Sequence, residues 1–443
     1  FLTANPQKSW ELFQKAVKLV DRTTECEKLY ILANNYRRHD NPSKAVEMLE
    51  KLIGRYPHEI RAYELLAYSY KNQMLLPHKG AEALELGIKT NPSAKHLMNN
   101  LAYFYVFLDQ KQKALDMVNQ YIKMAPAEPN PYDTKGDIYS IFLQHDSSIA
   151  SYRKAFELRS DFANGLGFSA VANSQYKEAQ RYFEITRYKY PIIEIHKGQI
   201  LKAINKLKGI MDSQKDTLGV FYRIIPLYYE TGQYKEMMHI SNELSIMLNK
   251  DPGDKFYGRT YIAWSLIKNG KSEEADKLIQ ELKISTQNTP MQKVIINYLT
   301  AVISYEKGDF NSALNKFTEV FEAIPPKHWP SIYFAVTLLK TGKVSASIDL
   351  LKQIVEWPPY YGISILFFIP GNFEYWPIPT VKAHYWLGVA YEKKGRVQNA
   401  IDEYKKFTDI WKNADFDSPE LNNAKKRIVK LTGQNNTDIS QKQ

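Results

Sequence analysis

Apolar residues recur along the chain at spacings of three and four residues, in short blocks separated by polar turns. This spacing places them on one face of a helix. The segment 95–126 predicts two such helices joined by a turn at residues 109–113 and ended by Pro126, because proline cannot donate the next backbone hydrogen bond. The two apolar stripes are Met98, Leu101, Ala102 and Tyr105, then Ala114, Leu115, Val118, Tyr121 and Ile122. Neither helix can bury its stripe alone, so the pair needs neighbours.

The neighbours come from internal repetition. Small or apolar residues comparable to Ala114 recur at Ala45, Gly80, Ala114, Ser148, Ala179, Ala203, Met237, Ala275, Ala313, Ser347 and Ala400. Subtracting successive residue numbers gives steps of 35, 34, 34, 31, 24, 34, 38, 38, 34 and 53. A period near 34 with helix–turn–helix content resembles the tetratricopeptide repeat family over nearly the whole chain. The resemblance implies an all-α, right-handed superhelical solenoid of antiparallel helix pairs.

The repeats divide the chain into regular and irregular parts. The 24-residue step before Ala203 leaves Ile192 to His196 as a very short first helix, which predicts a kink between Asn173 and Gly198. Glycines near 232, 270, 308 and 342 are expected to end first helices in the left-handed conformation. The predicted organisation is a partial repeat or N-terminal cap at 1–25, an N-terminal array at 26–191, an irregular C-terminal array at 192–356, an insertion at 357–379, a last repeat with a capping helix at 380–431 and a flexible tail at 432–443.

The insertion, WPPYYGISILFFIPGNFEYWPIP, is rich in both aromatic residues and prolines. Its five prolines exclude a long helix. Two interpretations stay open: a segment folded back over the solenoid, or a lid or partner-binding loop. The second makes a set of aromatic residues candidates for an interface: Trp357, Tyr360, Tyr361, Phe367, Phe368, Tyr375 and Trp376.

Composition adds few constraints. A hydrophobic content of 44% and a charged content of 24% are ordinary for a globular protein. The net charge of +11 comes from residues interleaved with Asp and Glu along the helices, which is typical of solvated faces and does not favour nucleic-acid binding. The single cysteine, Cys26, excludes an internal disulfide. No apolar stretch is long enough to span a bilayer, and the first residue is Phe rather than Met, which indicates an excised or processed piece whose compartment stays unknown.

No pattern for catalysis or cofactor binding is present in the sequence. Phosphate loops, HExxH pairs, GxSxG turns and cysteine clusters are all missing, and the nine histidines are scattered. Asp415 and Asp417 lack the further ligands of a calcium loop, so a helix-ending turn is the better interpretation. The sequence therefore predicts a non-enzymatic protein with no cofactor and no metal site.

Stacked helix pairs form a long concave surface lined by the first helix of each pair. The polar and aromatic positions of the N-terminal first helices are candidates for binding an extended peptide, because amides pair with its backbone and rings pack on its side chains. These candidates are Tyr30, Asn34, Arg37, Arg38, Tyr68, Lys71, Asn72, Asn99, Tyr103 and Phe107, with Asp133 and Asp137 beyond them. The residue set of a carboxylate clamp is not reproduced, since only Asn34 agrees among the first positions.

Three segments resemble the tetratricopeptide regions of particular proteins. EKLYILANNYRRHDNPSKAVEMLEKLIGRYP, PNPYDTKGDIYS and HYWLGVAYEKKGRVQNAIDEYKKFTDIWKNADFDSPEL are similar to the repeats attached to microbial serine/threonine kinases, adenylate cyclases and winged-helix regulators. That resemblance implies a sensory or protein-interaction module of a larger signalling protein, with a protein or extended peptide as partner. A structural scaffold or homo-oligomer built through the insertion is the alternative, and nucleic-acid binding is the least favoured.

Overall fold

The apolar stripes fold into helices over almost the whole length of the chain. The computed structural model describes residues 6–39, 41–213, 217–249, 252–285, 289–324, 331–357 and 376–440, and all regular secondary structure in these ranges is helical. The segment that predicts a helix pair forms α6 (Lys95–Phe107) and α7 (Lys111–Met124). The described helices include none that is long and apolar enough to cross a membrane.

The helices alternate between two layers, because each stripe packs on the helix that follows it. The first helices of the pairs are α2 (Glu25–Arg38), α4 (Ile60–Asn72), α6, α8 (Asn130–Ile141), α10 (Asn164–Ala172), α12 (Ile192–His196), α14 (Thr217–Glu230), α16 (Pro252–Lys268), α18 (Pro290–Glu306), α20 (Ile332–Lys340) and α23 (Ile378–Lys393). The second helices are α3 (Pro42–Arg55), α5 (Pro77–Thr90), α7, α9 (His145–Leu158), α11 (Tyr176–Thr186), α13 (Ile200–Asp212), α15 (Tyr234–Leu248), α17 (Ser272–Ser285), α19 (Phe310–Ala323), α21 (Val344–Val355) and α24 (Val397–Ile410).

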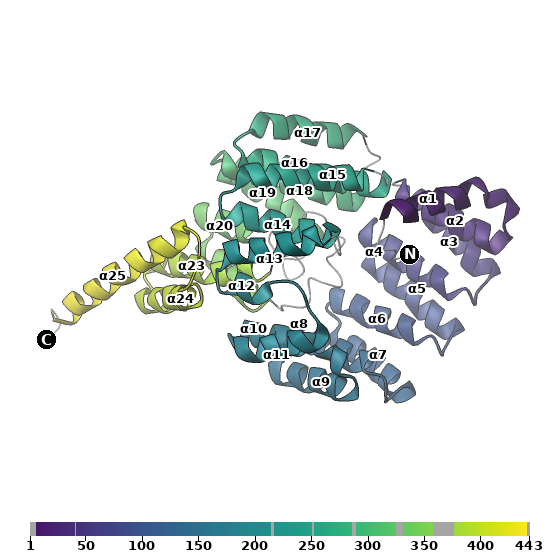
Figure 1. Ribbon diagram of the computed structural model, residues 1–443, viewed down its shortest axis with the longest axis horizontal. Coiled ribbons are helices and arrows are strands. Elements are labelled where there is room, and N and C mark those ends of the chain that lie inside the picture. The colour runs from purple at the N-terminus through teal and green to yellow at the C-terminus, as the bar shows by residue number, and fades with distance from the viewer. Residues whose placement is uncertain are drawn as a thin grey trace.

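Both ends carry additional helices. At the N-terminus α1 (Pro6–Lys18) and the short 3₁₀ turn η1 (Val20–Arg22) pack on α2. In the middle of the chain a second 3₁₀ turn, η2 (Ser160–Phe162), precedes α10. At the C-terminus α25 (Pro419–Ser440) packs on α24 and then extends away from the body of the molecule (Figure 1). The backbone is helical as far as Ser440, beyond the start of the tail expected from residue 432, since no proline interrupts the helix after Pro419.

Small residues bring the two helices of a pair into contact, as the repeat markers predict. The marker residues named above are all buried, from Ala45 to Ala400. Ser148 Oγ donates to the Gly136 carbonyl at 2.8 Å, and Ser347 Oγ donates to the Ala335 carbonyl at the same distance. A Cβ on Gly136 would lie 2.4 Å from the ring of Tyr152, so a larger residue would push α8 and α9 apart.

The turns also follow the sequence signals. Gly232, Gly270, Gly308, Gly342 and Gly395 all have φ between 68° and 82°, in the left-handed region that favours glycine. The short first helix predicted at residues 192–196 is present as α12. The division of the array at this point into two halves stays a prediction.

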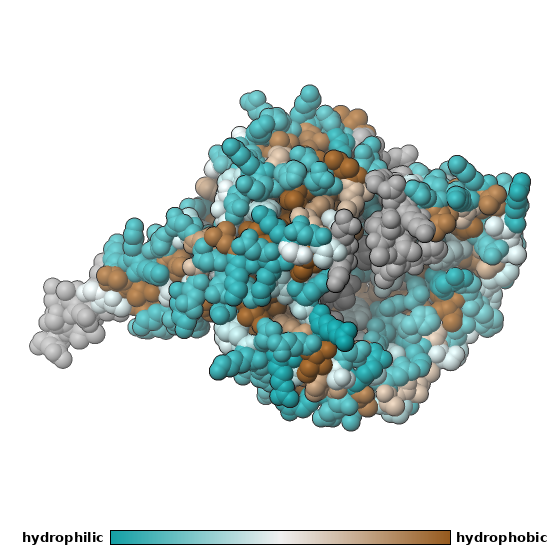
Figure 2. Space-filling view, viewed as in Figure 1, coloured by the Kyte–Doolittle hydropathy of each residue, from teal (hydrophilic) through white to brown (hydrophobic). Residues whose placement is uncertain are grey.

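The array curves and returns on itself. Figure 1 shows the N-terminal pairs on the right, α8 to α11 at the bottom and α15 to α19 at the top. Helix α2 packs against α16, and the backbone amide of Met291 donates to the Gln73 carbonyl at 3.4 Å. On the face shown in Figure 2, hydrophilic side chains dominate and hydrophobic ones are scattered, because the apolar stripes lie between the layers.

Two further junctions tie the C-terminal end to the middle of the chain. The Asp415 carboxylate accepts from the backbone amides of Leu201 and Lys202, both at 2.9 Å, and so caps the N-terminus of α13. Lys382 of α23 forms ion pairs with Glu230 of α14 at 3.1 Å and Glu420 of α25 at 2.8 Å. The turn at residues 415–419 therefore caps α13 in addition to connecting α24 to α25.

Candidate protein-binding surface

The first helices form the inner layer of the curved array. Successive first helices pack directly on one another, α4 on α6, α6 on α8 and α16 on α18, while no comparable packing joins successive second helices in the described residues. A stack whose one layer is more tightly spaced must curve toward that layer. The predicted binding residues on α2, α4, α6 and α8 therefore belong to the concave side.

The predicted residues of α2 are engaged within the fold. Asn34 donates to the carbonyl of Tyr30 at 2.9 Å, and the Tyr30 ring lies under the Arg61 guanidinium at 5.0 Å. Arg38 stacks on the rings of Trp10 and Phe13 in the N-terminal cap, at 5.7 and 5.1 Å.

Arg37 and Arg38 also face α16. Burial lowers the pKa of both arginines, and the nearby carboxylate of Asp254 opposes that shift. Burial in turn raises the pKa of Asp254. These groups lie where α2 meets α16, so the structure places the two arginines at an internal junction of the array.

Two predicted residues of α6 are bonded to the next first helix. Asn99 Oδ1 accepts from Thr134 Oγ1 at 2.6 Å and from Asn130 Nδ2 at 3.2 Å. The Tyr103 hydroxyl donates to Asp137 Oδ2 at 2.5 Å. These bonds join residues 31 to 35 positions apart, so they connect neighbouring repeats. They fix α6 on α8 and occupy groups that the sequence assigned to recognition.

Asp137 is the centre of a buried polar cluster. Its other carboxylate oxygen accepts from the Tyr152 hydroxyl at 2.7 Å, and the Asp137 side chain is almost fully buried. Burial raises the pKa of Asp137 to about 7, against the effect of the two tyrosine hydrogen bonds. Burial and the neighbouring Asp137 charge raise the pKa of Asp133 as well. The two carboxyl groups therefore share less than two full charges near neutral pH.

Helix α4 carries the predicted residues Tyr68, Lys71 and Asn72. Tyr68 is 39% exposed and packs edge-on against Phe104, and Asn72 is half-buried. Lys71 is 6% exposed, and its ammonium lies 5.5 Å from the ring centre of Phe104 and 5.0 Å from that of Phe107.

Lys71 has no carboxylate partner among the described residues, and burial lowers its pKa to about 7. The positions one repeat before and after Lys71 carry no carboxylate either. Residues 35–38 are Asn, Tyr, Arg and Arg, and residues 104–107 are Phe, Tyr, Val and Phe. An ammonium group in this position is short of hydrogen-bond acceptors. The candidate surface is thus reduced to the three predicted residues of α4 and Phe107 of α6, with the buried ring of Phe104 beneath them.

The insertion residues divide into two groups. Trp357 and Trp376 are buried, 5% and 7% exposed, and the Trp376 ring packs edge-on against Phe168 of α10 at 5.8 Å. Trp357 lies with Ser169 and Asn173 in a cleft beside α10. Both tryptophans therefore contribute to the core rather than to an exposed interface. The remaining predicted interface residues lie outside the described residues: Tyr360, Tyr361, Phe367, Phe368 and Tyr375.

This architecture defines a class of protein: an all-α solenoid of antiparallel helix pairs with an inner surface of first helices. Models of the tetratricopeptide repeat match residues 29–58 and residues 373–415, near the two ends of the array. The chain therefore carries tetratricopeptide repeats at these two places. No curated protein sequence matches it.

Solved structures with similar local folds include several of MamA. A crystal structure of MamA is 19% identical, with a TM-score of 0.29, over 35% of this chain and 92% of that chain. MamA 41-end from Desulfovibrio magneticus RS-1 is 17% identical, with a TM-score of 0.30, over 37% and 94%. MamA MSR-1 C2 is 20% identical, with a TM-score of 0.27, over 36% and 92%.

Proposed function

We propose that the chain is a non-catalytic protein-interaction module that binds an extended peptide along the inner surface of α4 and α6. The tetratricopeptide architecture supports a protein-interaction or scaffold role. The observation that carries the peptide site is Lys71, a buried amino group flanked by two phenylalanine rings on the inner layer, with no carboxylate partner in the described part of the chain. An acidic group that binds beside it would favour its charged form.

The chemistry of this surface selects the kind of peptide. Phe107 offers partly exposed apolar ring surface beside the Lys71 side chain, and the buried ring of Phe104 lies next to both. Tyr68 and Asn72 lie on α4 together with Lys71, and their side chains carry groups that can form hydrogen bonds with a peptide backbone. A peptide with an acidic residue next to an apolar one satisfies both parts of the surface, because the acid pairs with Lys71 and the apolar side chain covers the rings. The wider role, the sensory part of a larger signalling protein, rests on the resemblance of the repeats alone.

The test is selection of peptides from a random display library on the wild-type chain, followed by binding measurements on variants. Lys71→Met removes the charge and keeps the length of the side chain. We expect it to weaken the selected peptides by about tenfold or more, the effect of losing a charge-assisted contact of about 1.5 kcal/mol. Lys89→Met is the matched control, since Lys89 is exposed on the outer helix α5.

Two results would contradict the proposal. One is a library that yields no peptide binder on wild-type protein. The other is a Lys71→Met variant with wild-type helicity that binds the selected peptides as well as Lys89→Met does. Exchange of Asp or Glu for Asn or Gln in the selected peptides must also reduce binding to the wild-type chain and leave binding to Lys71→Met unchanged.

A further inference from the structure

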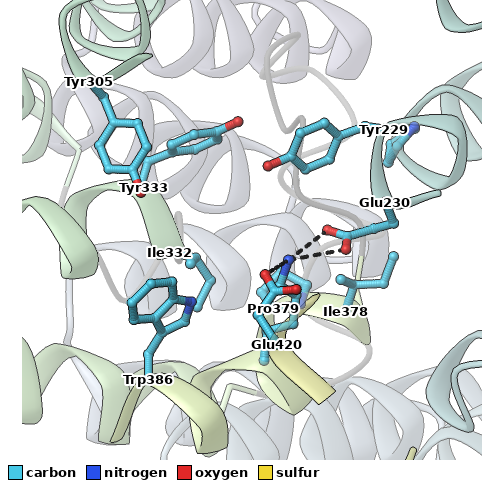
Figure 3. A pocket seen from close by; sticks show the side chains of 11 residues that line it. Tyr229, Glu230, Tyr305, Ile332, Tyr333, Ile378, Pro379, Trp386 and Glu420 are labelled. Atoms are coloured by element: carbon cyan, nitrogen blue, oxygen red, sulfur yellow. Dashed lines mark hydrogen bonds and ion pairs between the residues drawn. The ribbon is translucent and has the colours of Figure 1, made fainter. Parts of the chain in front are cut away.

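A cavity of about 90 Å³ lies between five helices of the C-terminal half, α14, α18, α20, α23 and α25 (Figure 3). It is lined by four aromatic side chains and three charged ones: Tyr229, Tyr305, Tyr333, Trp386, Glu230, Glu420 and Lys382. It lies apart from the α4 surface, and the function proposed above makes no use of it. Its volume is large enough for several water molecules or a small molecule.

The aromatic residues surround the cavity on more than one side. Figure 3 shows Tyr305, Tyr333 and Trp386 on one side and Tyr229 on the other. The rings of Tyr305 and Tyr333 pack edge to face at 5.2 Å, which holds both in place. Outside the cavity lining, the Lys268 ammonium already lies 4.6 Å from the ring centre of Tyr229 and 4.9 Å from that of Tyr333. These rings thus already contact one cation through their electron-rich faces.

The charged residues of the lining leave a negative charge. Lys382 is shared by two carboxylates, at 3.1 Å from Glu230 and 2.8 Å from Glu420, so one positive charge faces two negative ones. The side chains are 11%, 9% and 22% exposed for Lys382, Glu230 and Glu420. Lys268 does not balance the remaining charge, because it pairs with Glu306. Glu230 also feels the charge of Lys268, yet burial still raises the pKa of Glu230, so a further cation would stabilise its carboxylate.

We propose that this cavity binds a small organic cation of the methylated ammonium class, the head group found in choline. The aromatic walls enclose the methyl groups, and the carboxylates of Glu420 and Glu230 supply the opposite charge. An anion would meet Lys382 but also both carboxylates. A bare metal ion would find apolar ring faces over much of the wall and two carboxylates already engaged by Lys382.

The experiment is calorimetric titration of the full chain with three probes: choline, its uncharged analogue of the same shape 3,3-dimethyl-1-butanol, and the small anion acetate. We expect saturable binding of choline, with the neutral analogue weaker by about tenfold or more, and no binding of acetate. Glu420→Gln and Trp386→Leu should each weaken choline by a similar factor. Glu273→Gln, an exposed position on α17, is the matched control and should bind choline like the wild type.

The outcomes separate support from refutation. Equal affinity for choline and its neutral analogue, or no saturable binding of either choline or a trimethyl-lysine peptide to wild-type protein, overturns the proposal. So does unchanged choline affinity in both lining variants, with their helicity and melting temperature verified. A short peptide carrying trimethyl-lysine tests the source of the head group. Binding of free choline assigns a small-molecule ligand, whereas binding of the peptide alone assigns a modified side chain of a partner. Either result supports a methylated ammonium ligand.

Discussion

The closest helix contacts of the array predict a large effect from adding one methyl group. Tyr152 of α9 lies between two glycines, Gly136 of α8 and Gly165 of α10, and a Cβ on either would lie 2.4 Å from its ring. The ring is 1% exposed and its hydroxyl is bonded to Asp137 at 2.7 Å. The ring cannot move away from one glycine without approaching the other. Gly136→Ala must therefore separate α8 from α9 or break the bond to Asp137.

The magnitude follows from these two routes. Overpacking a close contact costs about 1–3 kcal/mol. Breaking the hydrogen bond to a buried carboxylate adds about 1–3 kcal/mol. We therefore expect Gly136→Ala to reduce the free energy of unfolding by about 2–5 kcal/mol. Gly209→Ala is the matched control, because Gly209 lies in α13 with no atom within 4 Å of a Cβ, and alanine there should stabilise the helix by about 0.5–1 kcal/mol.

The assay is urea unfolding followed by far-ultraviolet circular dichroism, with hydrogen exchange of α8 to α10 measured in water. Repeat arrays can unfold in parts, so exchange in α8 to α10 should report the change more directly than the global midpoint. A double variant with Tyr152→Leu isolates the clash, since Gly136→Ala should cost much less in that background. If Gly136→Ala shifts neither the midpoint nor the exchange relative to Gly209→Ala, the close packing inferred for this repeat is wrong.

Two other predictions test the junction and the buried acids. Asp415→Ala should speed hydrogen exchange at the start of α13 and lower the free energy of unfolding by about 1 kcal/mol, because the Leu201 and Lys202 amides lose their cap. The control Asp409→Ala, on the exposed face of α24, should change neither quantity. Burial raises the pKa of Asp137 to about 7 from an ordinary value of 3.8. Between these two values the folded state holds a proton that the unfolded state has released, so stability should fall as the pH rises from about 4 to about 7. Asp137→Asn should flatten that decline in melting temperature, and an equal decline in the variant would contradict the assignment.

Local features of the fold were predictable because they depend on short stretches of sequence. Ala114 and the residues equivalent to it are buried since a repeat of about 34 residues fixes both the helix face and the partner helix. Gly270 and Gly308 have left-handed φ because a first helix must turn back at those positions. Each prediction needs only the repeat and its neighbour.

The junctions were not predictable, because they depend on the curvature accumulated over many repeats. Lys382 meets Glu230 across 152 residues, and Asp415 caps an amide 214 residues away. Nothing in the local pattern around Asp415 indicates the helix that it caps. Arg37 and Arg38 lie near Asp254 of α16 for the same reason, so two residues assigned to the open groove lie where α2 meets α16.

The assignment of Asn99 and Tyr103 to recognition overlooked a signal that the sequence does contain. Tyr103 and Asp137 are 34 residues apart, Asn99 and Thr134 are 35 apart, and Asn100 and Glu64 are 36 apart. Polar residues on the inner layer thus pair with polar residues one repeat away, where stacking places the two first helices side by side. The repeat period therefore separates two kinds of inner-layer residue.

Residues with a complementary partner one period away hold the stack together, and residues without one are the candidates for binding a ligand. By this criterion Lys71 is distinctive, since the groups that it meets on the following repeat are the rings of Phe104 and Phe107. Glu230 is distinctive too, because residues 263–266 are Ala, Trp, Ser and Leu, and its ion pair is with Lys382 from the far end of the array, while Lys268 of the next repeat acts on it only through its nearby charge. The two proposed binding regions, the α4 surface and the aromatic cavity, are thus built around inner-layer charges that form no ion pair with the neighbouring repeat in the described part of the chain.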